Sequence, residues 1–288
     1  MSVNISLEEI KKIWASSAPD IKNINKYVEK YKGETIVIKY GGNVLIDREI
    51  FNNFIEDISI LNKLGLSIVV VHGGGPRIKR ELEKSNISTK FINGLRVTDA
   101  KIIKIVESVL IDFNNDIVNS LNKKESKAVS INTKTKNVIN VTPENEELGF
   151  VGKPREINID LLNELIRNNQ IPVVAPLGLG SNGQTYNING DTAAGAIAKS
   201  LKSRRLLLMT NVEGVLNKEK KLIPELSSTK ILEMIKNETI SGGMIPKINT
   251  CLDSVNNGVR GVVIMDGRKK NSILNEIFSD AGAGTLIR

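Results

Sequence analysis

Short runs of β-branched and aliphatic residues recur along the chain, and most are followed directly by glycine or by a polar side chain. A continuous apolar run of this length predicts a strand that is buried on both faces of a parallel sheet. Between these runs, apolar residues recur at three- and four-residue spacing, which predicts amphipathic helices. The predicted strands are 36–38, 68–71, 171–176, 206–209 and a last one at 262–265. The alternation indicates an α/β fold with an open, mostly parallel sheet and helices on both faces.

Helices are predicted wherever the apolar spacing persists between two strands. The longest begins at Thr98 and Asp99, which are preferred helix caps, and its stripe is long enough to line a subunit interface as well as the sheet. The predicted helices span 47–64, 76–84, 98–121, 159–166, 192–201, 228–236, 248–256 and 273–278.

Three further segments carry other predictions. Residues 127–131 and 137–141 are predicted to be the two strands of a hairpin, and residues 148–154 a mobile loop or lid. Residues 178–183 match the spacing G-x-G-x-x-G, but an alternating segment follows them. A dinucleotide fingerprint requires a helix there and an acidic residue further on, so these glycines predict a hairpin turn instead.

The first 31 residues predict a helical arm that precedes the sheet. Apolar residues line one helical face up to Trp14, Pro19 interrupts the pattern, and a second face runs from Ile21 to Tyr31. An amphipathic helix must bury its apolar stripe. The arm therefore packs either on the body of its own chain or on a partner.

Charge and composition narrow the class of protein. The 288 residues carry a net charge of +8, with 40% apolar and 4% aromatic residues. The lysines cluster in predicted loops without interleaved aromatics, which argues against a nucleic-acid surface. No apolar run approaches the ~20 residues that cross a bilayer, and residues 1–10 lack the pattern of a secretory signal. One cysteine, Cys251, excludes an internal disulfide, so we expect a buried thiol and a cytoplasmic protein.

Candidate chemistry gathers where the predicted strands end. Lys39 ends the first strand, and Gly41 and Gly42 open the turn after it. In open α/β sheets ligands bind beyond the carboxyl ends of the strands. A cation beside an unobstructed backbone predicts an anionic ligand such as a phosphate. The alternative is a solvated lysine beside an ordinary turn.

The second strand is followed by His72, three glycines and Pro76, which suits the first position of a helix. Exposed amides and the helix dipole make this an anion cradle, although a purely structural turn stays open. His72 is the only histidine. It could act as an acid or a base, but the interpretation we favour is a structural imidazole bonded to the backbone.

Four more polar positions follow. Arg96 suits a carboxylate or a structural salt bridge. Asn187 and Asn189 point the same way on a strand because they are two residues apart. Asp191, at a helix start, could be a cap or could orient nearby lysines. Lys247 falls in a first helical turn, where the dipole disfavours a cation unless an anion partners it.

Two lysines, glycine cradles and one aspartate suit phosphoryl transfer, in which positioning and charge neutralisation supply most of the catalysis. The sequence has neither the G-x-x-x-x-G-K-[ST] loop nor the signature set of protein kinases. It therefore predicts neither of the two commonest phosphotransferase designs.

Five motifs resemble the acetylglutamate kinase branch of the amino acid kinase superfamily, in order from about Thr35 to the end of the chain. Asn-Gly-Leu-Arg-Val-Thr is what separates this branch from the aspartate, glutamate, uridylate and carbamate kinases. The motifs are Ile-Val-Ile-Lys-Tyr-Gly-Gly-Asn at 36–43, Val-Val-His-Gly-Gly-Gly-Pro at 70–76, Asn-Gly-Leu-Arg-Val-Thr-Asp at 93–99, Tyr-Asn-Ile-Asn-Gly-Asp at 186–191 and Ser-Gly-Gly-Met-Ile-Pro-Lys at 241–247.

The resemblance implies that ATP phosphorylates the side-chain carboxylate of N-acetyl-L-glutamate, the second step of arginine synthesis. Lys39 and Lys247 would stabilise the transferring phosphoryl group, and Asp191 would orient both lysines. The residues implied in substrate binding are Gly74, Gly75, Arg96 (for the α-carboxylate), Asn187 and Asn189. The residues implied at the nucleotide are Gly41, Gly42, Asn211, Gly214, Leu216, Thr239, Ser241 and Met244.

A carboxylate nucleophile is already ionised at neutral pH, so no general base is required. Since the sequence shows no clustered carboxylates, we expect Mg²⁺ to arrive with the nucleotide and no metal site on the chain. The implied organisation is a helical arm at 1–31, an acetylglutamate-binding lobe at 32–178 and a nucleotide-binding lobe at 179–288 of one kinase domain.

The resemblance also implies assembly: a dimer through helix 98–121 and a hexamer through the arm, with arginine as effector and a nitrogen-signalling trimer as partner. Three positions depart from the family pattern. Asn271 replaces the usual histidine of the effector segment and leaves arginine inhibition open. Asn211 replaces the usual aspartate and should affect nucleotide affinity, and the polar residues 130–133 replace a glycine-rich segment and should affect substrate-loop detail.

Two alternatives compete with this hypothesis. A kinase for another small acid would need a residue other than Arg96 to recognise its substrate. A catalytically weak member could act by assembly alone, as an arginine-binding regulatory protein. Intact Lys39, Asp191 and Lys247 argue against the second alternative.

Overall fold

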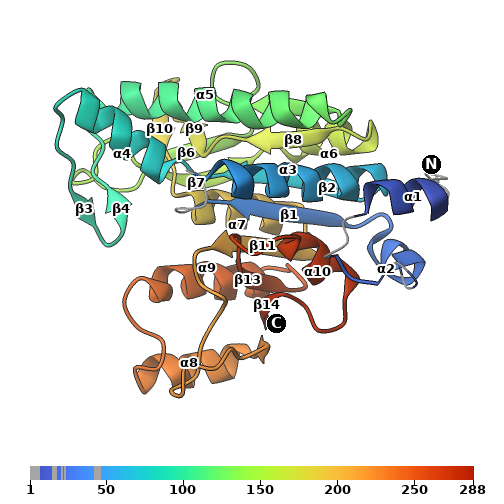
Figure 1. Ribbon diagram of the computed structural model, residues 1–288. Coiled ribbons are helices and arrows are strands. Elements are labelled where there is room, and N and C mark those ends of the chain that lie inside the picture. Colours follow the sequence, from blue (N-terminus) through green and yellow to red (C-terminus); the bar gives the residue numbers. More distant parts are fainter. Residues whose placement is uncertain (1–6, 15–17, 21, 23, 42–46) are drawn as a thin grey trace.

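The first strand of the chain lies in the middle of an eight-stranded sheet (Figure 1). The computed structural model describes residues 7–14, 18–20, 22, 24–41 and 47–288. Every neighbouring pair in this sheet is parallel except β13–β14. In spatial order the strands are β12 (Glu225–Leu226), β14 (Gly284–Ile287), β13 (Val262–Asp266), β11 (Arg205–Thr210), β1 (Thr35–Tyr40), β2 (Ser67–His72), β8 (Ile171–Val174) and β5 (Ala128–Ile131).

Two smaller sheets accompany the large one. A four-stranded sheet has the order β10 (Thr185–Asn187), β9 (Leu177–Leu179), β6 (Ile139–Pro143) and β7 (Gly152–Ile157). A two-stranded hairpin is formed by β3 (Phe91–Ile92) and β4 (Leu95–Arg96).

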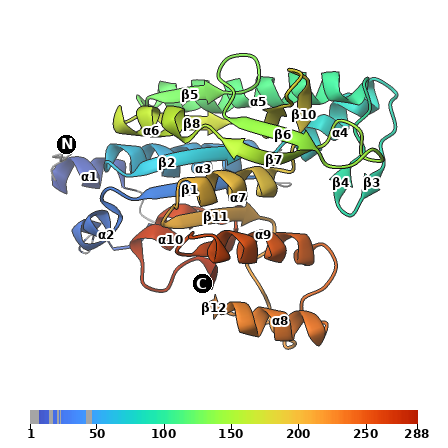
Figure 2. The same ribbon diagram turned by 180° about the vertical axis from the view of Figure 1, so that it is seen from behind.

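Helices cover both faces of the large sheet, as the sequence predicted. Successive residues of a strand point to opposite faces, so the sheet has a separate core cluster on each face. Ile36 and Ile38 of β1 belong to one cluster and Val37 to the other. The first face carries α1 (Leu7–Ile13), α2 (Ile24–Tyr31), α3 (Arg48–Lys63), α5 (Ile102–Lys123) and α10 (Ser272–Phe278). The second, seen from behind in Figure 2, carries α6 (Ile159–Arg167), α7 (Gly190–Ser200), α8 (Ser228–Lys236) and α9 (Met244–Asn256). A third cluster joins α4 (Gly75–Lys84) to α5.

The N-terminal arm packs on the body of its own chain. Ile24, Tyr27 and Tyr31 of α2 are buried in the same cluster as α10. Trp14 and Tyr27 both meet the ring of Phe278 edge-on, at centroid distances of 5.3 and 6.3 Å. The predicted interruption is confirmed, since α1 and α2 are separate helices on either side of Pro19. The side chains of Leu7 and Ile13 lie outside the described residues.

The predicted hairpin of 127–131 and 137–141 is wrong. Both strands exist, but β5 adds to the edge of the large sheet in parallel with β8, while β6 pairs with β7 in the smaller sheet. Asn132 turns the chain away between them, because its side-chain oxygen accepts from the backbone N–H groups of Lys134 and Thr135. The glycine-rich hairpin at 178–183 is confirmed between β9 and β10.

Residues 148–154 do not form the predicted loop. Leu148 and Phe150 bond through their backbones to Thr98, and Gly152 begins strand β7. The structure also corrects the predicted start of the long helix, which was Thr98. Thr98 is fixed in a bridge with Gly149, and the Asp99 carboxylate accepts from the N–H groups of Lys101 and Ile102, so α5 begins at Ile102.

Two boundaries of the C-terminal part also differ from the prediction. Helix α9 begins at Met244 rather than Ile248, so Lys247 still lies in its first turn. Strand β13 is not the last, because β14 follows it and pairs antiparallel. A Cβ on Gly284 would lie 2.1 Å from the backbone oxygen of Ile264, so the close approach of these two strands requires glycine there.

The predicted boundary near residue 178 falls within strand β9 of the four-stranded sheet, and the parts of the chain before and after it both contribute strands to the eight-stranded sheet. The division into two lobes stays a prediction. The buried thiol is confirmed: Cys251 has no exposed surface, and burial raises the pKa of its thiol. Among the helices that the structure describes, none has an apolar stretch long enough to cross a bilayer.

The docking of the arm predicts a measurable loss of stability. Replacing Ile24 by alanine should lower the free energy of unfolding by about 2–4 kcal/mol, because the side chain is 2% exposed and its removal leaves a cavity. Urea unfolding of both proteins measures the loss. Leu232→Ala, at a side chain 60% exposed, is the control and should change the value by less than about 0.5 kcal/mol. An arm that docks only on a partner would leave Ile24→Ala as stable as the control.

Candidate active site

The candidate site lies where the order of strands reverses. Strand β1 has β2 on one side and β11 on the other, and the chain reaches these neighbours by connections on opposite faces. Helix α3 leaves β1 on the first face, and α7 leads into β11 on the second. In open α/β sheets such a switch point opens a crevice at the carboxyl ends of the strands. Lys39, the next-to-last residue of β1, points into it.

Asp191 joins two lysines from separate elements. Its carboxylate lies 2.9 Å from Nζ of Lys39 and also pairs with Nζ of Lys247. All three side chains are at least four-fifths buried. Burial alone would raise the pKa of Asp191, but the charges and hydrogen bonds of the two lysines outweigh it and hold that pKa far below its usual range. The carboxylate therefore stays ionised.

Local structure explains why these three groups meet. Val37 and Lys39 are two residues apart on β1, so both face the layer of α7 and α9. Asp191 and Lys247 each lie in the first turn of one of these helices. The helices pack closely, because a Cβ on Gly195 would lie 2.9 Å from a side-chain atom of Thr250.

Asp191 is not the cap of its helix. Asn189 fills that position, since its side-chain oxygen accepts from the N–H groups of Asp191 and Thr192. The capping alternative for Asp191 is therefore wrong, whereas its ion pairs with both lysines agree with the prediction that it orients them. Asp191 is also the anionic partner that a lysine in the first turn of α9 requires.

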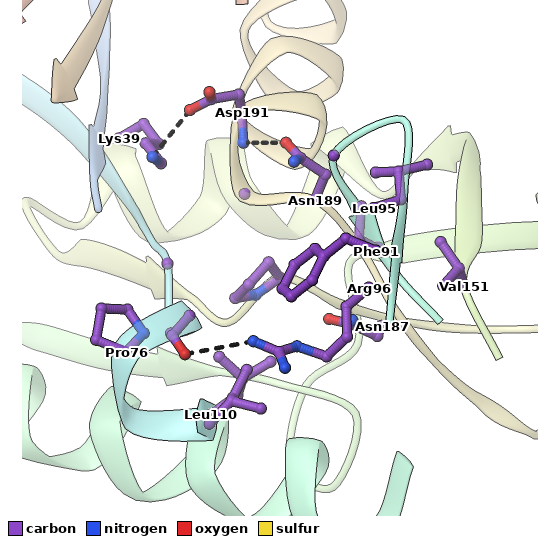
Figure 3. Close-up of a pocket in the computed structure, with 18 residues that line it drawn as sticks. Lys39, Pro76, Phe91, Leu95, Arg96, Leu110, Val151, Asn187, Asn189 and Asp191 are labelled. Atoms are coloured by element: carbon purple, nitrogen blue, oxygen red, sulfur yellow. Dashed lines mark hydrogen bonds and ion pairs between the residues drawn. The ribbon is translucent and has the colours of Figure 1, made fainter. Parts of the chain in front are cut away.

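A cavity of about 220 Å³ opens beside Lys39 and Asp191 (Figure 3). Its wall includes Gly73, Gly74 and Gly75, at the end of β2 and the start of α4. A Cβ on Gly74 would lie 2.3 Å from a methyl group of Leu110, so the cradle packs directly on α5. Pro76 is the second residue of α4, whereas the sequence predicted it at the first position.

Arg96 enters the cavity from strand β4, on the side opposite Lys39 in the view of Figure 3. Its Nη2 donates to the backbone oxygen of Gly75 at 3.4 Å, and its guanidinium lies 4.7 Å from the ring centroid of Phe91. Within the described ranges, Nη1 is buried without a hydrogen-bond partner and no ion pair to Arg96 is found. Burial lowers the pKa of this guanidinium. The structural salt bridge, the alternative for Arg96, is thus not found in the described part of the chain.

The two asparagines complete the wall. Asn187 and Asn189 both line the cavity, and Nδ2 of Asn187 donates to Oγ1 of Thr98 at 3.4 Å. The structure therefore brings together Lys39, Gly74, Gly75, Arg96, Asn187, Asn189 and Asp191 around one cavity, with Lys247 attached through Asp191.

The residues predicted at a nucleotide do not line this cavity. Gly41 follows β1, and Gly42 lies outside the described residues. The others follow β11, lie in the connection that leads into α9 or, for Met244, begin that helix, on the Lys247 side of the site. They are Asn211, Gly214, Leu216, Thr239, Ser241 and Met244.

Sequence reasoning missed the hairpin of β3 and β4, which brings Phe91, Leu95 and Arg96 to the cavity. A signal was present. Asn93 and Gly94 have φ values of 50° and 80°, and an Asn-Gly pair between short apolar segments is a strong predictor of a tight hairpin. Gly190 was also missed: a Cβ there would lie 3.3 Å from Cε of Lys39 and 3.5 Å from the backbone oxygen of His72.

Among the described residues, no group of three or more His, Cys, Asp or Glu side chains could hold a metal ion. Asp191, a carboxylate that lines the cavity, is already engaged by two ammonium groups. Such a carboxylate is a poor ligand for a further cation.

Comparison with known proteins places these features in a family. Residues 34–266 match the model of the amino acid kinase family. An acetylglutamate kinase of Pelagibacter ubique is 54% identical to this chain, and the match covers 98% of each protein. An acetylglutamate kinase of Ruegeria pomeroyi is 46% identical, and the match covers 97% of this chain and 98% of the relative. The crystal structure of smu.665 from Streptococcus mutans covers 88% of this chain and 98% of its own, with 32% identity and a TM-score of 0.75.

The electrostatics of Asp191 predict a pH-dependent stability. Replacing Asp191 by asparagine should lower the free energy of unfolding at pH 7 by ~3 kcal/mol, because two buried ammonium groups lose their partner. The pKa of Asp191 is depressed on folding, so its contribution is present above the unfolded value of about 3.9 and is lost as the pH falls below it. Urea unfolding of wild type and variant should therefore differ less at pH 3 than at pH 7.

The matched control is Asp253→Asn. Asp253 also joins α7 to α9, through Lys199, but its side chain is 56% exposed. Its removal should cost less than about 1 kcal/mol at either pH. A difference for Asp191→Asn that is the same at pH 3 and pH 7 would contradict the assigned ion pairs.

Proposed function

This chain belongs to the amino acid kinase family, and from that premise we propose that it is an acetylglutamate kinase. It transfers the terminal phosphoryl group of ATP to the side-chain carboxylate of N-acetyl-L-glutamate, a step of arginine biosynthesis. The observation that carries the proposal is one ionised aspartate that holds two lysines beside a cavity, together with a guanidinium for which no ion pair is found in the described part of the chain. High identity to relatives of that name over nearly the full chain supports it.

The two lysines address the main difficulty of the reaction. An anionic carboxylate must approach an anionic phosphate, and ammonium groups fixed in a poorly solvated site lower that repulsion. Asp191 holds Lys39 and Lys247 in place without needing to accept a proton. We assign Lys39 and Lys247 to stabilising the transferring group, and Asp191 to orienting both. No side chain need act as a base, because the substrate carboxylate is already ionised.

The opposite side of the cavity would bind the rest of the substrate. Nη1 of Arg96 is buried and has no hydrogen-bond partner among the described residues, which suits the α-carboxylate of an acylated amino acid. Asn187 and Asn189 can bond the amide of the acetyl group, and Gly74 and Gly75 leave space for an anion at the start of α4. A cavity of about 220 Å³ is in keeping with one small acid.

The nucleotide would lie on the Lys247 side. Use of ATP follows from membership of the kinase family. The position of Gly41, Asn211, Thr239 and Ser241 around the end of β11 and the start of α9 supports a nucleotide site there. Mg²⁺ would neutralise phosphate charge and arrive bound to ATP, which agrees with the full engagement of Asp191 by lysines.

The deciding measurement is ADP release with Mg-ATP, offering N-acetylglutamate, glutamate, aspartate, uridylate and carbamate separately. Hydroxylamine traps any acyl phosphate. We expect turnover and trapped hydroxamate only with N-acetylglutamate, because Arg96 and the asparagines match an acylated amino acid. Turnover with another acid would retain the lysine pair and discard the substrate assignment. No turnover with any of them would favour a regulatory assembly instead.

In the same assay, Lys247→Ala should lower kcat at least about 100-fold, since it removes a fixed charge from the transferring group. Lys199→Ala is the matched control, because it breaks the exposed pair between α7 and α9 away from the cavity. Unchanged turnover in Lys247→Ala would remove this lysine from the catalytic assignment.

We further propose a dimer through α5, whose outer side carries the partly exposed apolar residues Ile105 and Val109 one turn apart. Light scattering should give the mass of two chains or a multiple of two. The double variant Ile105→Glu, Val109→Glu should give one chain or half the assembly, while Leu232→Glu on α8 should leave the mass unchanged. Monomeric wild type would contradict the dimer. The hexamer, the arginine effector and the signalling trimer stay predictions.

A further inference from the structure

A series of four hydrogen-bonded polar side chains, of which His72, Asn114 and Asn132 are buried and Ser130 is partly buried, runs behind the glycine cradle. Nδ2 of Asn132 donates to Oγ of Ser130 at 2.9 Å, and that hydroxyl donates to Oδ1 of Asn114 at 2.6 Å. Nδ2 of Asn114 lies 3.1 Å from Nε2 of His72, whose Nδ1 lies 2.8 Å from the backbone oxygen of Gly73. His72 and Asn114 have no exposed surface. This series of hydrogen bonds therefore ends at the backbone oxygen of Gly73, the first glycine of the cradle.

The partners fix which atoms carry protons. The backbone oxygen of Val173 can only accept, so the atom of Asn114 that lies 2.8 Å from it is the amide nitrogen. That nitrogen also faces Nε2 of His72, which must then accept. The oxygen of Gly73 can only accept as well, so Nδ1 of His72 carries the ring proton. Both assignments give the same neutral tautomer.

Strand parity accounts for this placement. His72 ends β2 on the face opposite Lys39, where it meets the ring of Phe113 edge-on at 5.0 Å. Phe113 and Asn114 are neighbours on α5, the helix on which the cradle packs. Ser130 on β5 and Asn132 just after it supply the outer end of this hydrogen-bonded series.

Hydrogen bonds fix the backbone of the first two glycines of the cradle, Gly73 and Gly74, at three atoms. The N–H of Gly73 donates to the oxygen of Tyr40 at 2.7 Å, and the oxygen of Gly74 accepts from Ile78 at 2.9 Å. His72 holds the third point, the oxygen of Gly73. In a planar trans peptide the C=O and the following N–H point in opposite directions. Fixing the Gly73 oxygen toward the buried histidine therefore turns the N–H of Gly74 toward the cavity.

We propose that His72 is a positioning residue, whose Nδ1–H, held in register by Asn114, orients the Gly73–Gly74 peptide so that the cradle presents an N–H group to the bound anion. The proposal rests on the proposed function, since the anion is the acid or the phosphoryl group of that reaction. The imidazole takes no part as an acid or a base. Burial lowers the pKa of His72 to about 4, so the ring is neutral at physiological pH.

Two amide variants separate positioning from packing. In His72→Asn the side-chain amide nitrogen can take the position of Nδ1 and still donate to the backbone oxygen of Gly73. In His72→Gln the side chain is longer, so its amide oxygen can take the position of Nε2 and accept from Asn114, but the bond to Gly73 is lost. Both remove the ring and should lower the melting temperature similarly. With N-acetylglutamate and Mg-ATP, kcat/KM of His72→Gln should fall at least about tenfold below that of His72→Asn. Equal kcat/KM values, or the reverse order, would overturn the proposal.

A second measurement needs neither variant nor turnover. Because the chain has a single histidine, ¹⁵N NMR of histidine-labelled, tag-free protein reports this ring alone. We expect the neutral Nδ1–H tautomer, unchanged from pH 5.5 to 9. An Nε2–H tautomer, or titration near the ordinary pKa of about 6.5, would overturn the proposal. A wild type inactive on every acid would overturn the proposed function alone, and the spectrum would still decide the hydrogen bond.

Discussion

The constraint on which the site depends is the burial of one carboxylate between two ammonium groups. Each of these charges would be costly to bury alone, and removing the aspartate leaves both lysines unpaired. The arrangement therefore requires three elements to converge: the end of β1, the first turn of α7 and the first turn of α9. The glycine at position 195 allows the two helices to approach closely enough. Packing one turn along α7 from Asp191 thus helps to set the distances between the three charges.

The two faces of the sheet contribute different parts of the site. Lys39 on β1 and His72 on β2 lie at the same edge but point to opposite faces, because their strands are in register at Tyr40 and His72. The face of α7 and α9 carries the charged groups. The face of α5 carries a neutral hydrogen-bonded support that ends on the cradle. The charges can therefore act on a ligand while the backbone beside them stays fixed.

The sequence was informative wherever a single segment decides the outcome. The buried strands, the polar residues at their ends and the helix after Asp47 depend on local pattern, and each was predicted. Choices between distant partners were not predictable in this way. The segments 127–131 and 137–141 could pair with each other, yet β5 finds β8 about 40 residues later, where Ile131 and Val174 are both buried. Likewise Asn189 and Asp191 are both residue types that can cap a helix. Asp191 is engaged by Lys39 of β1 and Lys247 of α9, and Asn189 is the cap, which the local sequence alone does not reveal.

The charges in and beside the cavity do not balance. Lys39, Lys247 and Arg96 contribute three positive charges and Asp191 one negative charge, which leaves two positive charges uncompensated among these residues. A fold selected for stability alone would neutralise them or replace them with apolar side chains. The surplus positive charge preorganises the site for its ligands. The substrate brings two carboxylates, and the transferring phosphoryl group brings further negative charge. The folded chain thus holds positive charges that repel one another, and the ion pairs of Asp191 keep them in place. An anion that binds relieves this repulsion, which favours its binding.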